Sequence, residues 1–152
     1  MRWLHEKDIE NIAIGATVLG TGGGGDPYIG KMMALSAIKK FGPVQVVSVD
    51  ELNENDWVLP ASGMGSPSVL VEKIPSFEQL SAPLQAYEKA CGKKTDVVMP
   101  IEVGGVNSLI PVAVAAMNRI PILDGDAMGR AFSRSTDGHF PPSQKHRWSL
   151  ST

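Results

Sequence analysis

The sequence predicts an α/β fold, built on an open, mostly parallel sheet with flanking helices, in an N-terminal domain that is incomplete. Short β-branched segments alternate with helical segments, which is typical of parallel strands joined by crossover helices. Three of the predicted strands lead directly into glycine-containing loops. The length of 152 residues suits a single hydrophobic core.

Two helices are predicted on either side of a glycine-rich turn. Apolar residues recur at helical spacing over 8–19, where Asp8 is expected to cap the helix and Gly20 to end it. The segment "DPYIGKMMALSAIKKFG" then predicts a second helix, with Asp26 as its N-cap and Pro27 at its first position. The turn "GTGGGGD" therefore lies between two helices, with no strand before it.

The rest of the chain alternates strands and helices up to a change of composition. Strands are predicted at 43–50, 57–62, 95–101 and 120–123, and helices at 76–94 and 107–119. Pro83 is expected to kink or split the first of these helices, and Asn107 to cap the second. Residues 1–132 form the predicted α/β domain. Residues 133–152 hold seven Ser or Thr and no Val or Ile, so they predict a disordered or aberrant tail.

Composition excludes several classes of function. The chain has 14 basic and 16 acidic residues and no block of like charge, so nucleic-acid binding is not expected. Cys91 is the only cysteine, which excludes an internal disulfide and fits a reducing compartment. No signal peptide precedes the first helix, and the longest apolar run is too short to span a bilayer. We therefore expect a cytoplasmic protein that does not bind a membrane.

The glycine-rich turn fits two phosphate-binding patterns, but neither has its usual context. G-x-G-x-x-G starts at Gly20, where a helix and not a strand comes before it. G-x-x-x-x-G-K starts at Gly25, but Met32 stands where a P-loop has Ser or Thr. No nucleotide cofactor is expected. Two alternatives remain: an anion or oxyanion site at a helix N-terminus, and a tight connection that lets helices and sheet approach closely.

Small-residue loops follow three predicted strands, as "SGMGSP", "EVGGVN" and "DGDAMGR". Ligands of open α/β sheets bind beyond the carboxyl ends of the strands, so these loops and the glycine-rich turn are expected to surround one crevice. The substrate-binding residues predicted there are Gly22, Gly23, Gly24, Gly25, Asp26, Gly63, Gly104, Gly105, Asn107 and Arg130.

Three segments resemble a known family. "LGTGGGGDPYIG", "PIEVGGVNSLIP" and "PILDGDAMGRAF" are similar to the signature segments of the S-methyl thiohydantoin desulfurase-like family, and the resemblance covers residues 8–132. It implies an α/β N-terminal domain followed by a mainly β domain, and activity on small cyclic ureide-like substrates. It also implies a possible hydantoinase or oxoprolinase-type partner. The chain departs from the family after residue 132.

Carboxylates suit the chemistry that this resemblance implies, because displacing a sulfur substituent with water needs a base. Glu102 is the first choice of general base, since it follows a buried strand; the alternative is a structural carboxylate. Asp124 and Asp126 could share acid and base work or hold a divalent cation, or form an Asx turn. Three functions stay open: a hydrolase domain, a non-catalytic binding or assembly subunit of a hydantoinase/oxoprolinase-type system, and an inactive truncated fragment.

Overall fold

The structure is a computed structural model that describes residues 2–21, 23–65, 72–73 and 75–129. Within these residues a five-stranded sheet has the order β1-β2-β5-β4-β3, and every pair is parallel except β1 with β2. The strands are β1 (Arg2–Leu4), β2 (Val44–Val47), β3 (Val58–Ala61), β4 (Val97–Pro100) and β5 (Ile122–Leu123). The helices are α1 (Glu6–Leu19), α2 (Pro27–Phe41), α4 (Phe77–Cys91) and α5 (Ile110–Asn118), with 3-10 turns η1 (Val49–Glu51) and η2 (Gly105–Ser108). The predicted α/β fold is confirmed.

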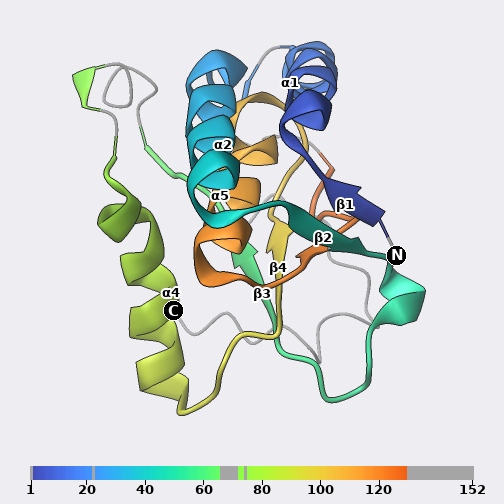
Figure 1. Cartoon of the computed structure of the whole chain (residues 1–152), viewed down its shortest axis with the longest axis vertical. Helices are drawn as coiled ribbons and strands as arrows, with labels where there is room; N and C mark the ends of the chain where they lie inside the picture. Colours follow the sequence, from blue (N-terminus) through green and yellow to red (C-terminus); the bar gives the residue numbers. More distant parts are fainter. Residues whose placement is uncertain (1, 22, 66–71, 74, 130–152) are drawn as a thin grey trace.

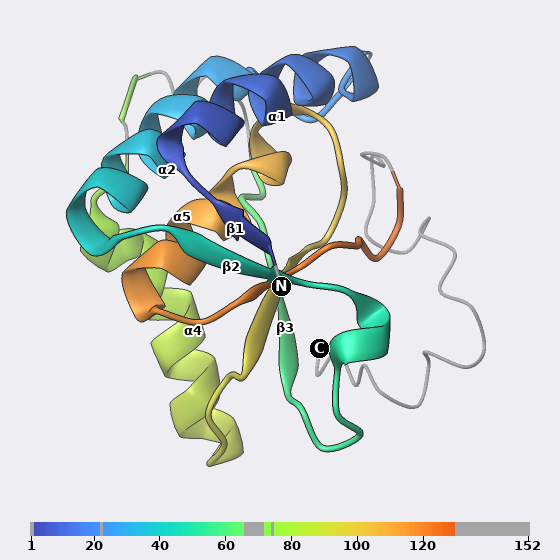
Figure 2. The ribbon, with the colours of Figure 1, turned by 45° about the vertical axis from the view of Figure 1, so that its right-hand side comes forward.

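The two faces of the sheet differ in what covers them. Strand side chains alternate between the faces. Val46, Val98 and Ile122 pack with the helices in the main core. Their neighbours Val97 and Leu123 belong to a second, smaller apolar cluster. Figure 2 shows α1, α2, α4 and α5 on one side of the sheet. The described part of the chain is thus a sheet with one helical layer, in which α5 lies against the central strands.

The first two helices flank the glycine-rich turn as predicted, although the start of α1 differs. His5 is the N-cap of α1, and its main-chain N–H donates to Asp8 Oδ2 at 2.8 Å. The prediction that Asp8 is the cap is therefore wrong, because Asp8 satisfies the helix start from inside the first turn. The prediction for α2 is confirmed: Asp26 Oδ1 accepts from the Tyr28 N–H at 2.8 Å.

The later helices correct one prediction and part of another. Helix α4 continues through Pro83, so a split at this residue is excluded, while the alternative of a kink stays a prediction. The helix predicted from Asn107 begins instead at Ile110, after the turn η2, and Asn107 is buried within η2 without capping a helix. Gly104 and Gly105, with φ of 111° and 62°, turn the chain sharply at the start of η2.

Strand β1 was not predicted at all. Arg2–Leu4 pairs antiparallel with Val44–Val46 of β2 and so covers that edge of the sheet.

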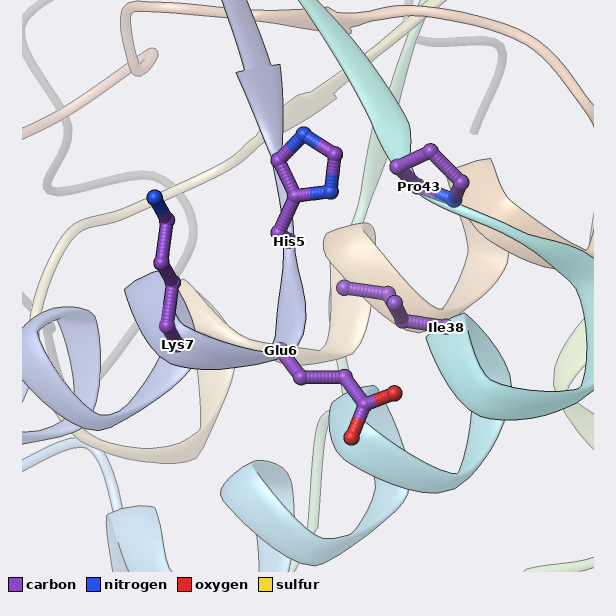
Figure 3. A pocket seen from close by; sticks show the side chains of 5 residues that line it. All are labelled: His5, Glu6, Lys7, Ile38 and Pro43. Carbon is purple, nitrogen blue, oxygen red and sulfur yellow. The ribbon is translucent and has the colours of Figure 1, made fainter.

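Next to β1, a shallow pocket of about 440 Å³ lies where α1 begins and α2 ends. Figure 3 shows its lining side chains, among which Glu6 extends toward α2. No predicted site residue lines this pocket.

Within the described ranges, no helix is long and apolar enough to cross a membrane.

Candidate functional site

The segment 101–108, which follows β4, lies at the centre of the candidate site. The main-chain N–H of Val106 donates to the carbonyl of Gly24, in the turn between α1 and α2, at 2.8 Å. Asn107 Oδ1 accepts from the N–H of Gly63, in the segment after β3, at 2.8 Å. Two loops that are distant in the sequence are therefore bonded directly to this central segment.

The loop after β5 reaches the same segment. The N–H of Ala127 donates to the carbonyl of Ile101, and the N–H of Val103 to the carbonyl of Gly129, both at 3.1 Å. In Figure 1, β3 and β4 point toward the end of the molecule where α1 turns into α2. The four loops converge as the sequence predicted, over the residues that the structure describes. The role of each residue stays a prediction.

The glycines at this convergence pack main chain against main chain. A Cβ atom on Gly105 would lie 2.1 Å from the carbonyl oxygen of Gly24, and one on Gly24 would lie 2.9 Å from that of Gly104. Real Cβ atoms do not come so close to backbone, so only glycine fits there. The bare backbone thus serves a close approach between the turn and the central segment. This favours the tight connection over the anion site for these residues.

Glu102 and Asn107 form a buried polar pair beside this packing. Glu102 is 5% exposed, and its Oε1 accepts from Asn107 Nδ2 at 2.7 Å. Asn107 is 7% exposed, and Nδ2 also donates to the Gly63 carbonyl at 3.2 Å. Among the described residues, the ion pairs involve the carboxylates of Glu6, Glu10 and Glu88. Glu102 therefore has a neutral amide, and not a cation, as its partner in this part of the chain.

The surroundings of Asp124 and Asp126 differ from those of Glu102 and Asn107. Asp124 is exposed, and its main-chain N–H donates to the Val47 carbonyl at 2.8 Å. Asp126 Oδ1 accepts from the N–H of Gly129, three residues later, which is a local bond within the loop but one residue longer than the Asx turn considered as an alternative. Over 2–21, 23–65, 72–73 and 75–129, no group of three or more His, Cys, Asp or Glu residues could hold a metal ion.

The remaining predicted residues have simpler surroundings. Gly23 is exposed and donates to the Gly20 carbonyl at 2.9 Å, Asp26 caps α2, and Gly63 is exposed. Gly22 and Arg130 lie outside the described residues.

Sequence reasoning missed one member of the site. Ser108 Oγ accepts from the Gly104 N–H at 2.7 Å and so holds the strained turn before η2. A serine four residues after a glycine is too common to predict such a bond.

Comparisons with known proteins agree with this geometry. The family model described as "S-Me-THD-like, N-terminal domain" matches residues 7–140. A crystal structure of a protein from Chromobacterium violaceum is similar, with 26% identity and a TM-score of 0.72. The alignment covers 88% of this chain but only 37% of that one. No curated protein matches the chain. The chain thus belongs to the S-Me-THD-like family, whose N-terminal domain it contains.

Proposed function

We propose that this chain is part of an S-methyl thiohydantoin desulfurase, an enzyme that removes the sulfur substituent of a hydantoin-type ring by hydrolysis. The observation that carries the proposal is the position of Glu102: a carboxylate 5% exposed, bonded to a neutral amide, beside the convergence of four loops. Membership of the S-Me-THD-like family supports the choice of substrate class. A covered carboxylate that is not paired with a cation is a candidate for a general base.

The proposed reaction needs a base, water and no oxidant. Glu102 takes a proton from water while the water oxygen bonds to the ring carbon that lies between two nitrogens. The bond from this carbon to sulfur then breaks, and methanethiol leaves with the proton that Glu102 returns. The remaining hydroxyl proton moves to the ring nitrogen, so that the carbon becomes a carbonyl. One water is consumed, and the products are hydantoin and methanethiol.

Release of methanethiol from S-methyl thiohydantoin tests the proposal, followed with a thiol-reactive chromophore. Cys91 is an exposed free thiol, so every measurement uses the Cys91→Ser background. Glu102→Gln keeps the size of the side chain and removes the base, and is expected to lower kcat about 10²- to 10⁴-fold.

Glu88→Gln is the matched control, because Glu88 is also a largely covered carboxylate but lies at the far end of α4. It is expected to keep the parent rate. Parent-like turnover by Glu102→Gln would reject Glu102 as the base. The same assay on the longer Chromobacterium violaceum protein shows whether turnover needs the parts of that protein that the alignment does not cover, since the alignment spans 37% of it.

A binding or assembly subunit is the second candidate, and one observation favours it. Large apolar side chains are exposed on the two helices next to the glycine-rich turn: Ile14, Val18, Leu19, Tyr28 and Met32. Exposed apolar surface of this kind marks interaction sites in many proteins. Binding of hydantoin without turnover, together with copurification of a hydantoinase or oxoprolinase-type protein, would support this candidate against the enzyme.

A further inference from the structure

The side chain of Asn107 makes three hydrogen bonds, which reach two segments. An asparagine amide has one oxygen acceptor and two N–H donors. The oxygen accepts from the Gly63 N–H at 2.8 Å, while Nδ2 donates to the Gly63 carbonyl at 3.2 Å and to Glu102 Oε1 at 2.7 Å. Because the amide is buried, these bonds are stronger than they would be in water. One side chain therefore joins the segment after β3 to the carboxylate after β4.

The pairing with Gly63 determines which end of the amide faces Glu102. The Gly63 N–H can bond only to the amide oxygen, and the Gly63 carbonyl only to an amide N–H. This arrangement leaves the second N–H of Nδ2 facing Glu102. A donor in this position bonds to the carboxylate oxygen and so fixes the direction in which the side chain of Glu102 points. If the amide were turned over, its oxygen would face the carboxylate and repel it.

We propose that Asn107 is a positioning residue that couples the segment 61–65 to Glu102. When this segment is in place, it holds the amide in the orientation that bonds to the carboxylate and keeps it aimed. Residues 62–65 are exposed, so a substrate over the site can touch them, and displacing them would release the base. The role of Glu102 as base rests on the proposed function, whereas the coupling itself does not.

Amide hydrogen exchange of Gly63 tests the coupling without any substrate. Asn107→Ala removes the acceptor of the Gly63 N–H and is expected to speed its exchange about tenfold. Asn107→Asp keeps an oxygen acceptor and loses both donors, so its Gly63 exchange is expected to stay near the parent rate. Asn118→Ala is the control: Asn118 donates to the Val114 carbonyl at 2.8 Å, within α5. It is expected to leave Gly63 unchanged.

Thermal unfolding of the reversed pair tests the contact with Glu102. Asn107→Asp alone places two carboxylates in contact and is expected to lower the Tm. Adding Glu102→Gln supplies an N–H donor to the introduced aspartate, so the double variant is expected to recover most of that loss.

Turnover separates positioning from a purely structural role. Asn107→Asp is expected to lower kcat of S-methyl thiohydantoin about 10²-fold with little change in KM, since misplacing a base affects the reaction more than binding. The stable double variant is expected to stay inactive.

Two results would overturn the proposal: Gly63 exchange in Asn107→Ala equal to that of the parent, or no recovery of Tm in the double variant. Asn107→Asp with the kcat of the parent would also reject the positioning role. If Glu102→Gln itself keeps full turnover, the proposed function has lost its base, while exchange and Tm still decide the coupling.

Discussion

A largely covered carboxylate lies near each end of β4, and the two carboxylates differ in their hydrogen-bond partners. Before the strand, Glu88 accepts from the Thr95 N–H at 2.7 Å and from Lys94 Nζ at 2.9 Å, with its side chain 12% exposed. After the strand, Glu102 accepts from the amide of Asn107 at 2.7 Å. The main-chain N–H of Thr95, and then Lys94, lower the pKa of Glu88 below its ordinary value of 4.5.

The comparison separates a carboxylate that holds the chain from one for which we propose a role in catalysis. Glu88 ties the end of α4 to the start of β4, and its charge is balanced by a cation. Such a group is a weak base, because its ionised form is already stabilised. Glu102 has a neutral donor that orients it without neutralising it.

A glycine also lies near each end of β4, and the two glycines differ in their surroundings. This contrast yields the largest predicted effect. Gly92 and Gly105 have nearly equal φ, 65° and 62°, but a Cβ on Gly92 meets nothing within 4 Å. Gly105→Ala is expected to lower the free energy of unfolding by more than about 4 kcal/mol, because the added atom overlaps the Gly24 backbone. Gly92→Ala is expected to lower it by only about 1 kcal/mol, from the unfavourable φ.

Denaturant unfolding measures both glycine variants. If the two alanine variants unfolded at the same denaturant concentration, the close backbone packing at the loop end would be disproved.

Removing the charge of Glu88 sharpens the comparison at the other end. Glu88→Gln is expected to lower the free energy of unfolding by about 1 kcal/mol at neutral pH, since charge-assisted bonds to Thr95 and Lys94 become neutral ones. Turnover is expected to stay unchanged. A loss of activity without a loss of stability would contradict the structural role of Glu88.

The pH dependence of stability provides a further test of Glu88. Its pKa is lower in the folded chain than in the unfolded one, so the unfolded chain binds the proton first as pH falls. The stability from Glu88 is therefore fully present above pH 4.5 and is lost as pH falls through the lowered pKa. The difference in Tm between parent and Glu88→Gln is expected to shrink in this acidic range. A difference that stays constant on acidification would exclude this linkage.

The smallest effect is predicted for the cation itself. Lys94 is 88% exposed, so Lys94→Met is expected to change the free energy of unfolding by about 0.5 kcal/mol or less. The Thr95 N–H would still hold Glu88 in place. A Tm scan in low and high salt measures this change, and a loss as large as that of Glu88→Gln would show that Lys94 contributes more than exposure suggests.

Local patterns in the sequence were sufficient where all partners lie close along the chain. Helix α2 was predicted at both ends because Asp26, Pro27 and Gly42 each act on neighbouring residues. The strands β2 to β5 follow from β-branched and apolar runs. Strand β1 was missed because three residues are too few to show an alternating pattern. Its formation depends on pairing with β2.

The site could be predicted only as a gathering of loops. The alternation of strands and helices along the chain placed the loops at one end of the sheet. Asn107 was expected to cap a helix, because no local pattern indicates that its partner is Gly63, 44 residues away. The glycine-rich turn indicated a close approach without showing that the approaching group is the protein's own backbone. Contacts of this kind depend on tertiary packing, which local propensity does not encode.

The backbone contact between Gly24 and Gly105 has a consequence for how relatives can diverge. The two segments meet through their main chains, without a side chain between them. A change of shape in one segment therefore cannot be accommodated by a new side-chain rotamer in the other. A substitution in one turn would require a compensating move of the opposite main chain. Relatives are thus expected to vary freely on the outer surfaces of α1 and α4, while the two turns co-evolve as a single unit.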